Sequence, residues 1–271
     1  MKVLVTGATG TTARALIPVL GERGAEVVAA SRRPGPRGVR FDWYDPDSHA
    51  AALDGVDRVY LVPPPDADPV EVMGAFLERA HRRGVRRAVL LGASAVPTGG
   101  PMVGRVARMV LEVFEEAVVL RPSWFMQNFT GDHPHAAGFR ERGAIATATG
   151  GGRVGFVDVR DIAAVAAHAL TDAEPIEREP VLTGPEALSY DEVAAIYGEV
   201  TGREVVHESL EPGAVERALA AAMPVEVARI LVGLDGLIAA GAEDRVTDTV
   251  ERIAGRPPGD LRTVLRRDLR P

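Results

Sequence analysis

Gly7, Gly10 and Ala13 recur at three-residue intervals in the stretch VTGATGTTAR near the N-terminus. An apolar run precedes the stretch and a helical pattern follows it. In that setting Gly7 allows a tight turn, Gly10 admits a pyrophosphate to the backbone, and Ala13 lets the helix pack on the strand. The N-terminus of the helix attracts the anion. Hydroxyl donors are available at Thr9, Thr11 and Thr12. The pattern predicts a dinucleotide site.

The residues after the second apolar run decide which dinucleotide is expected. An NAD site calls for an acidic residue there, but the chain reads Ser31-Arg32-Arg33. Glu26 begins this run and therefore lies at the opposite edge of the sheet. A hydroxyl and a guanidinium suit a 2′-phosphate, so Ser31 and Arg32 predict NADP(H). Arg33 is equally consistent with a solvated loop charge.

A second group of chemistry-bearing residues surrounds His133 and His135, within DHPH. Two histidines and one aspartate lack a third placed ligand, so we expect a polar loop over 128–139 and no metal site. Either histidine could act as an acid near neutral pH. Asp158 and Asp161 stand at a predicted helix start, where capping and domain docking are the expected roles.

These residues require a framework of alternating strands and helices. Short apolar runs predict strands at 2–6, 26–30, 39–41, 58–62, 86–92 and 117–121. Helical spacing is found at 11–23, 69–83 and 101–115, with Pro18 as a candidate kink in the first of these helices. Such alternation indicates βαβ units and a parallel sheet. The fold class is therefore α/β, a Rossmann-type doubly wound sheet.

The chain changes character after Pro122. Helices are predicted at 158–172 and 189–202, the second with a capping box of Ser189 and Glu192. PVLTG at 180–184 could add a late strand, and the stretch from 212 to 241 is alanine-rich and helical. We expect residues 1–130 and about 153–185 to form the NADP(H)-binding domain. Residues of about 131–152 and 186–271 would form a smaller, mostly helical substrate region.

Several longer motifs run along the chain: TGATGTTAR, FDWYDPDS, VDRVYLVPPP, LRPSWFMQNF, FVDVRDIA and VLTGPEALSYDEVA. They resemble the NmrA-like group of atypical short-chain dehydrogenases, in the branch of ergot-alkaloid-type and azoreductase-type NAD(P)H reductases. LRPSWFMQNF is the most specific, and together they cover nearly the whole chain. The resemblance implies an extended Rossmann fold that binds NADP(H).

The resemblance also implies roles for single residues. Asp42 would meet the adenine, and Val62 and Pro63 would line the adenosine ribose. Ala93 and Ser94 would lie near the nicotinamide ribose. Pro122, Trp124 and Phe125 would sit beside the nicotinamide. From the residues alone, Asp42 could instead cap a turn at Asp45, the prolines could stiffen a loop, and the aromatic residues could belong to the core.

The usual acid–base pair of short-chain dehydrogenases, Tyr-x-x-x-Lys, is missing. Its helix reads GPMVGRVARMVLEVF, and Lys2 is the only lysine of the chain. The proton donors left to consider are Ser94, Tyr44 and His133, with His135 beside it. We therefore expect an NADPH-dependent oxidoreductase that passes hydride to a small hydrophobic iminium, quinone, azo compound or activated alkene. The alternatives are an NADP(H) sensor without turnover and a non-redox enzyme such as a cyclase.

Composition limits the partners. A net charge of −7 disfavours nucleic acid, and the absence of cysteine excludes disulfides and thiolate catalysis. We expect a cytoplasmic protein, monomeric or homodimeric, with a small-molecule substrate and no membrane role. The arginines of RRGVRR, residues 82–87, are expected to be solvated.

Overall fold

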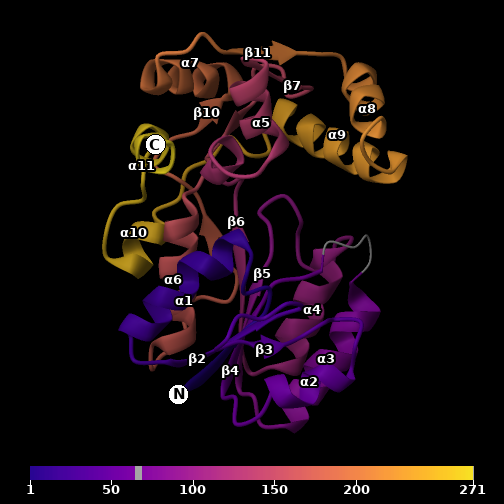
Figure 1. Ribbon diagram of the computed structural model, residues 1–271, viewed down its shortest axis with the longest axis vertical. Helices are drawn as coiled ribbons and strands as arrows, with labels where there is room; N and C mark the ends of the chain where they lie inside the picture. Colours follow the sequence, from indigo (N-terminus) through magenta and orange to yellow (C-terminus); the bar gives the residue numbers. More distant parts are fainter. Residues whose placement is uncertain (65–68, 271) are drawn as a thin grey trace. The chain divides into compact units, whose positions relative to one another are not determined.

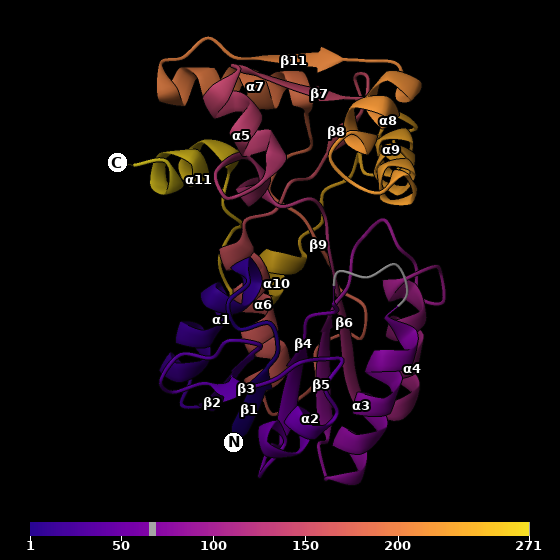
Figure 2. The same ribbon diagram turned by 45° about the vertical axis from the view of Figure 1, so that its right-hand side comes forward.

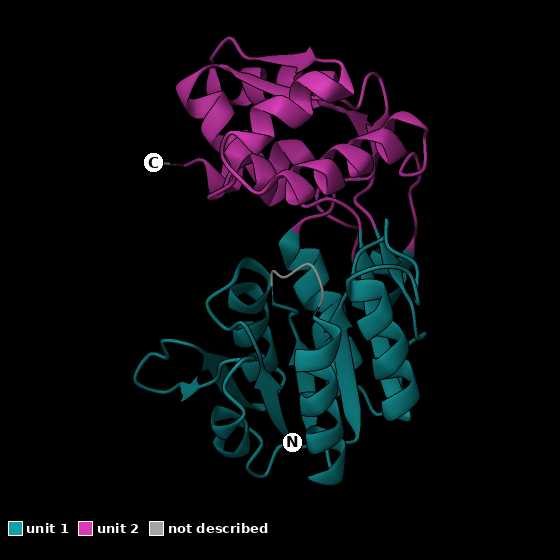
Figure 3. Ribbon diagram, turned by 90° about the vertical axis from the view of Figure 1, so that its right-hand side faces the viewer, with its two compact units in different colours: residues 1–122, 159–182, 249–255 teal, residues 123–158, 183–248, 256–271 magenta. Residues whose placement is uncertain are grey.

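The computed structural model describes residues 1–64 and 69–270. Pro65, the last residue of VDRVYLVPPP, lies outside the described residues. The chain forms two compact units (Figure 3). The first comprises residues 1–122, 159–182 and 249–255, and the second 123–158, 183–248 and 256–271.

The first unit is built on one parallel sheet of seven strands in the order β3-β2-β1-β4-β5-β6-β9 (Figure 1). The strands are β1 (Lys2–Val5), β2 (Glu26–Ser31), β3 (Val39–Arg40), β4 (Arg58–Leu61), β5 (Arg87–Leu91), β6 (Glu116–Pro122) and β9 (Val181–Leu182). The parallel sheet and its late strand are thereby confirmed. Val3 pairs with Val27 on one side and with Arg58 on the other, so the strand order reverses at β1. Ligands of open α/β sheets bind at such a switch point.

Helices cover both faces of this sheet (Figures 1 and 2). One face carries α1 (Thr11–Glu22), α6 (Val159–Thr171) and α10 (Thr249–Ala254); the other carries α2 (Asp47–Ala52), α3 (Val70–Arg82) and α4 (Val103–Val113). The core beneath α3 and α4 includes fully buried Leu4, Phe76 and Leu90. Pro18 lies inside α1, which continues beyond it.

Arg87 contradicts the expectation that the arginines at 82–87 are solvated, because only 1% of its surface is exposed. Its Nε contacts Glu116 Oε2 at 2.6 Å, and its Nη1 donates to the carbonyl oxygens of Ala169 (3.2 Å) and Asp172 (2.6 Å). The last carbonyls of a helix have no partner within it. Arg87 therefore satisfies the C-terminal end of α6 inside the first unit.

The second unit has two small sheets and several helices. Its elements are η1 (Met126–Phe129), α5 (Pro134–Glu141), β7 (Ala144–Thr147), β8 (Arg153–Val154), β10 (Leu188–Ser189), α7 (Tyr190–Thr201), β11 (Val206–Ser209), α8 (Pro212–Ala220), α9 (Val225–Ala239) and α11 (Leu261–Asp268). β7 pairs with β11 in parallel and β8 with β10 antiparallel. Phe129, Phe156 and Tyr190 lie in its core. The predicted capping box is confirmed, with Ser189 as the N-cap and Glu192 at the third helical position.

The loop expected over 128–139 is wrong, because most of it is helical. Pro134 occupies the first position of α5, where its missing N–H costs nothing. His133 is the N-cap, and its ring nitrogen accepts from the amide of His135 at 3.2 Å.

Among the described residues, no helix is both long and apolar enough to cross a membrane.

Candidate cofactor site

The turn after β1 has the backbone that a glycine-rich loop needs. Gly7 has φ of +61°, and a Cβ there would lie 3.2 Å from Cβ of Val62. The amide of Gly10 donates to the carbonyl of Gly7 at 2.8 Å, which closes the turn. A Cβ on Gly10 would meet only that carbonyl, at 3.1 Å, among the described atoms within 4 Å. Gly10 therefore leaves open space on its outer side.

The first turn of α1 presents backbone donors. The Arg14 amide makes the first bond of the helical type, to the Gly10 carbonyl at 3.0 Å. The amides at Thr11, Thr12 and Ala13 have no partner within the helix. No acidic side chain stands in this first turn. The geometry suits an anion, because aligned amides and the helix dipole both favour negative charge.

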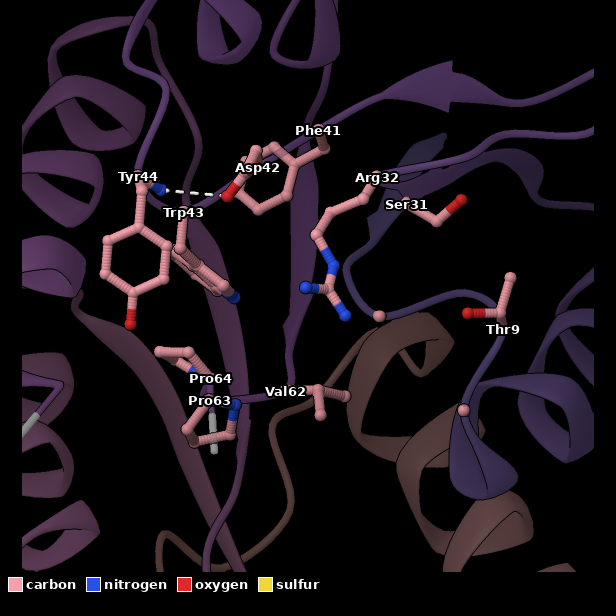
Figure 4. Close-up of a pocket in the computed structure, with 12 residues that line it drawn as sticks. Thr9, Ser31, Arg32, Phe41, Asp42, Trp43, Tyr44, Val62, Pro63 and Pro64 are labelled. Atoms are coloured by element: carbon pink, nitrogen blue, oxygen red, sulfur yellow. Dashed lines mark hydrogen bonds between the residues drawn. The ribbon is translucent and has the colours of Figure 1, made fainter. Parts of the chain in front are cut away.

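A cavity of about 250 Å³ opens beside this turn (Figure 4). It is lined by Gly7, Thr9, Gly10, Ser31, Arg32, Phe41, Asp42, Trp43, Tyr44, Val62, Pro63 and Pro64. Figure 4 shows the guanidinium of Arg32 extending into the space between Asp42 and Val62. The structure thus brings together the predicted residues of the phosphate and adenosine ends. Thr11 and Thr12 do not line the cavity, and Thr12 is buried.

The wall formed by residues 41–44 is held from behind by helix α2. Asp42 accepts from the amide of Tyr44 at 3.1 Å through its carboxylate. Its backbone amide donates to Ser48 Oγ at 3.0 Å, and its carbonyl contacts His49 Nε2 at 2.9 Å. Asp42 therefore does two things: it lines the cavity and shapes the turn that presents Tyr44.

Phe41, Trp43 and Pro64 line the cavity but were not among the predicted cofactor residues. Phe41 and Trp43 meet edge to face with ring centroids 4.9 Å apart, and both pack against Phe76. Their position could have identified them: Phe41 and Trp43 follow β3 and Pro64 follows β4, at the carboxyl ends of strands, where open α/β sheets bind ligands.

Three more predicted residues lie together at the carboxyl ends of β5 and β6. The amide of Ser94 donates to the Pro122 carbonyl at 2.9 Å, and Arg121 Nη2 donates to the Ser94 carbonyl at 2.9 Å. Ala93 precedes Ser94 in the chain. Ser94 is 4% exposed. These contacts fix the backbone at the carboxyl ends of two neighbouring strands, outside the cavity of the glycine turn.

The remaining predicted residues belong to the second unit. The Trp124 carbonyl accepts from the amide of Val157 at 2.9 Å, and Phe125 forms an isolated parallel bridge with Val157. Trp124 packs against the core of that unit. His133 stands at the start of α5. The cavity in the first unit contains none of these three residues.

The candidate proton donors differ in environment. Tyr44 is 59% exposed and stands in the glycine-loop cavity. Tyr60 and Tyr190 are fully buried, and burial raises the pKa of both above the ordinary tyrosine range. Burial lowers the pKa of His133, and burial together with neighbouring histidines lowers the pKa of His135 to about 3. Both shifts favour the uncharged imidazole.

Comparison with known proteins places this chain in a family. The model of the NAD dependent epimerase/dehydratase family matches residues 3–102. The chain is 41% identical to the uncharacterized oxidoreductase YesF of Bacillus subtilis, over 96% of this chain and 92% of that protein. It is 36% identical to agroclavine dehydrogenase of Claviceps fusiformis, over 95% and 94% of the two chains.

Two further proteins extend the comparison. NAD(P)H azoreductase of Xenophilus azovorans is 32% identical, over 94% of this chain and 93% of that one. The fold matches triphenylmethane reductase of Citrobacter sp. in complex with NADP(H), with a TM-score of 0.78, 22% identity, and coverage of 99% and 100%. Because these three relatives, each above 30% identity, align along almost the whole chain, the chain belongs to the NmrA-like atypical short-chain dehydrogenases, in the branch of ergot-alkaloid-type and azoreductase-type NAD(P)H reductases.

Proposed function

We propose that the protein is an NADPH-dependent reductase that delivers hydride to a small hydrophobic organic acceptor without a Tyr-x-x-x-Lys pair. The observation that carries the cofactor choice is the guanidinium of Arg32 inside the glycine-loop cavity. β2 ends at Ser31 and is followed by Arg32, with no carboxylate in the position that an NAD ribose requires. Charge-assisted hydrogen bonds from arginine match phosphate geometry.

The residues of the first unit fit the adenosine half of NADPH. The turn Gly7–Gly10 and the start of α1 would hold the pyrophosphate, with Thr9 as an added hydroxyl donor. Ser31 and Arg32 would bind the 2′-phosphate. Asp42, Val62, Pro63 and Tyr44 would surround the adenosine. Tyr44 shares its cavity with Arg32, which favours contact with the adenosine over a role as proton donor.

The nicotinamide half would be held by residues at and beyond the carboxyl ends of β5 and β6. Ala93, Ser94 and Pro122 form a fixed backbone there, and Trp124 and Phe125 come next in the chain. Of the predicted proton donors, Ser94 is the one that this assignment places beside the nicotinamide, from which the hydride is transferred. Its backbone is held on both sides, so its hydroxyl would be well oriented, although no lysine is available to make it a stronger acid.

When bound, NADPH supplies a hydride. The chain's own contribution is to orient the acceptor and exclude water, which can account for a large share of a rate enhancement. A cationic acceptor becomes neutral when it takes hydride, and no proton has to move. A ketone becomes an alkoxide and needs a donor, which is typically worth about 10²–10⁴-fold in rate. The missing acid–base pair therefore favours cationic or easily reduced acceptors over ketones.

The experiment measures NADPH consumption with a cationic triphenylmethane dye, a preformed iminium ion and a ketone of matched size. We expect turnover of the two cations and little turnover of the ketone. Ser94→Ala and Tyr44→Phe are assayed beside the wild type, and neither should change dye reduction by loss of a proton donor. Rapid ketone reduction that either variant abolishes would identify an acid and contradict the proposal. Tight NADPH binding without turnover of any acceptor would favour the sensor or non-redox alternative.

A further inference from the structure

A second cavity adjoins the glycine-loop cavity within the first unit. Its volume is about 600 Å³, and its lining includes Thr9, Ser31 and Arg37 beside apolar side chains of α1 and β2. Thr9 and Ser31 also line the glycine-loop cavity, so the two cavities meet at these hydroxyls. Figure 4 shows both residues at the end of the glycine-loop cavity that lies away from Tyr44. An anion bound to the Ser31 hydroxyl would therefore be accessible from both cavities.

Arg37 stands on a turn whose backbone is fixed. Gly35, Pro36, Arg37 and Gly38 form a β-turn, which is closed by a hydrogen bond of 2.9 Å from the Gly38 amide to the Gly35 carbonyl. Proline at the second position and glycine at the fourth are favoured in such turns. A Cβ on Gly38 would lie 2.9 Å from the carbonyl oxygen of Ala29, so the turn packs directly on β2. The connection between β2 and β3 therefore holds the backbone of Arg37 in a defined place beside the second cavity.

The arginines in and beside this connection differ in their partners. Arg40 forms an ion pair with Asp45, with 2.5 Å between Nη1 and Oδ2. Among the described residues, no carboxylate pairs with Arg32, Arg33 or Arg37. Arg32 lines the glycine-loop cavity and Arg37 lines the second cavity, whereas Arg33 lines neither of the two. Arg32 and Arg37 are therefore the two cations placed to meet an anion where the cavities join.

We infer that Arg37 is a second residue that selects NADPH: together with Arg32 it holds the 2′-phosphate at Ser31, each guanidinium from its own cavity. The inference rests on the proposed function, because that proposal places the 2′-phosphate at Ser31 and Arg32. A phosphate monoester carries a charge of about −1.5 to −2 near neutral pH, which is more than one guanidinium neutralises. Two guanidinium groups balance this charge, and each presents the planar fork of donors that suits phosphate oxygens.

The test measures binding of NADPH and NADH to the full chain by calorimetric titration. Arg37→Ala should raise the dissociation constant of NADPH by about 10-fold, the lower end for a hydrogen bond to a charged group, and should change that of NADH by less than about twofold. Arg37→Lys keeps the charge without the fork, so its NADPH affinity should lie between those of Arg37→Ala and the wild type. Arg33→Ala is the matched control, because it removes the same charge at a residue that lines neither cavity.

A second pair of probes isolates the phosphate contact from the rest of the cofactor. Adenosine 2′,5′-bisphosphate and adenosine 5′-monophosphate differ only in the 2′-phosphate, and both can be titrated as competitors of NADPH. Arg37→Ala should weaken binding of the bisphosphate and leave that of the monophosphate unchanged. Equal losses of NADPH affinity in Arg37→Ala and Arg33→Ala would indicate a long-range effect of charge. Unchanged NADPH affinity in Arg37→Ala would indicate a solvated turn residue, and either result overturns the inference.

The proposed function and this inference fail in different measurements. A wild-type protein that binds NADPH but reduces no acceptor contradicts the proposed function, and the titrations still decide the role of Arg37. A wild-type protein that binds NADH as tightly as NADPH overturns both the cofactor assignment and the role of Arg37. Loss of the preference for NADPH in Arg32→Ala, together with an unchanged preference in Arg37→Ala, overturns the role of Arg37 alone.

Discussion

The amide of Val62 donates a hydrogen bond of 2.8 Å to the hydroxyl of Thr6, and the same hydroxyl donates to the carbonyl of Tyr60 at 3.1 Å. Thr6 follows β1 and Val62 follows β4, two neighbouring strands of the sheet. The buried side chain of Thr6 therefore links the carboxyl ends of β1 and β4, and the glycine turn begins directly after Thr6. This link helps to shape the cofactor cavity, because Gly7 and Val62 both line the cavity.

Thr6→Val should destabilise the protein and weaken NADPH binding. Valine has the shape of threonine but leaves the Val62 amide without its partner, and an unsatisfied buried donor costs about 1–3 kcal/mol. Urea unfolding measures the loss, and a fluorescence titration measures NADPH affinity. Thr6→Ser keeps the hydroxyl and should behave nearly as the wild type. Equal stability of the valine and serine variants would contradict this role.

Arg32→Ala should weaken NADPH binding far more than NADH binding. A hydrogen bond to a charged group is worth about 1.5–3 kcal/mol, so the NADPH dissociation constant should rise by about 10- to 100-fold. Calorimetric titration with both cofactors measures the difference. Arg33→Ala, whose residue does not line the cavity, is the control. Equal losses for the two cofactors would place the 2′-phosphate elsewhere.

Gly10→Val should abolish dinucleotide binding in a protein that still folds. The Cβ would crowd only the Gly7 carbonyl among the described atoms within 4 Å, and the branched side chain would extend into the space proposed for the pyrophosphate. Gly21→Ala, at a helix position with nothing within 4 Å of the added Cβ, is the matched control. A folded valine variant with unchanged NADPH affinity would exclude the glycine turn as the phosphate site.

The sheet and its glycine turn could be predicted because each depends on local pattern. Buried parallel strands read as short apolar runs, and Gly7 and Gly10 stand directly between one such run and a helix. The helix α5 was missed because Pro134 and Gly138 both disfavour helices in general, yet the proline falls at the first position, where it is tolerated.

Features that depend on distant partners could not be predicted. Arg87 reads as one of several surface arginines, and only the fold brings Glu116 and the end of α6 to it. Tyr44 was proposed as a proton donor from its residue type, whereas its neighbours in space, Arg32 and Val62, favour the adenosine end. The contact between Ser123 and Glu243 likewise gave no signal in the sequence, because the two residues lie 120 positions apart.

Arg87→Met should destabilise the protein strongly. The substitution leaves Glu116 without its guanidinium and the carbonyls at the end of α6 without donors, and breaking a buried ion pair costs about 3–5 kcal/mol; the partial exposure of Glu116 places the expected loss at the lower end of that range. Thermal and urea unfolding measure the effect. Arg86→Met, at the exposed neighbouring position, should change stability by less than about 0.5 kcal/mol. Equal effects of the two substitutions would show that the buried contacts contribute nothing.

Stability of the second unit should fall as the pH drops below about 6.5, the ordinary pKa of histidine. Burial, together with the neighbouring His133 and His207, lowers the pKa of His135 to about 3. Burial also lowers the pKa of His133. Between the folded and unfolded pKa values the unfolded chain binds more protons. The free energy of unfolding therefore decreases with falling pH, by up to about 1.4 kcal/mol per pH unit for each such histidine.

His135→Phe tests this dependence, because it keeps a ring beside Phe129 and Tyr190 and removes the titrating group. Urea unfolding is followed between pH of about 5 and 7, above the usual carboxylate range. The variant should show a shallower loss of stability toward acid than the wild type. His81→Gln, at the exposed end of α3, is the control for removal of a histidine elsewhere in the chain. Parallel pH profiles for wild type and His135→Phe would mean that His135 is protonated as readily in the folded chain as in the unfolded one.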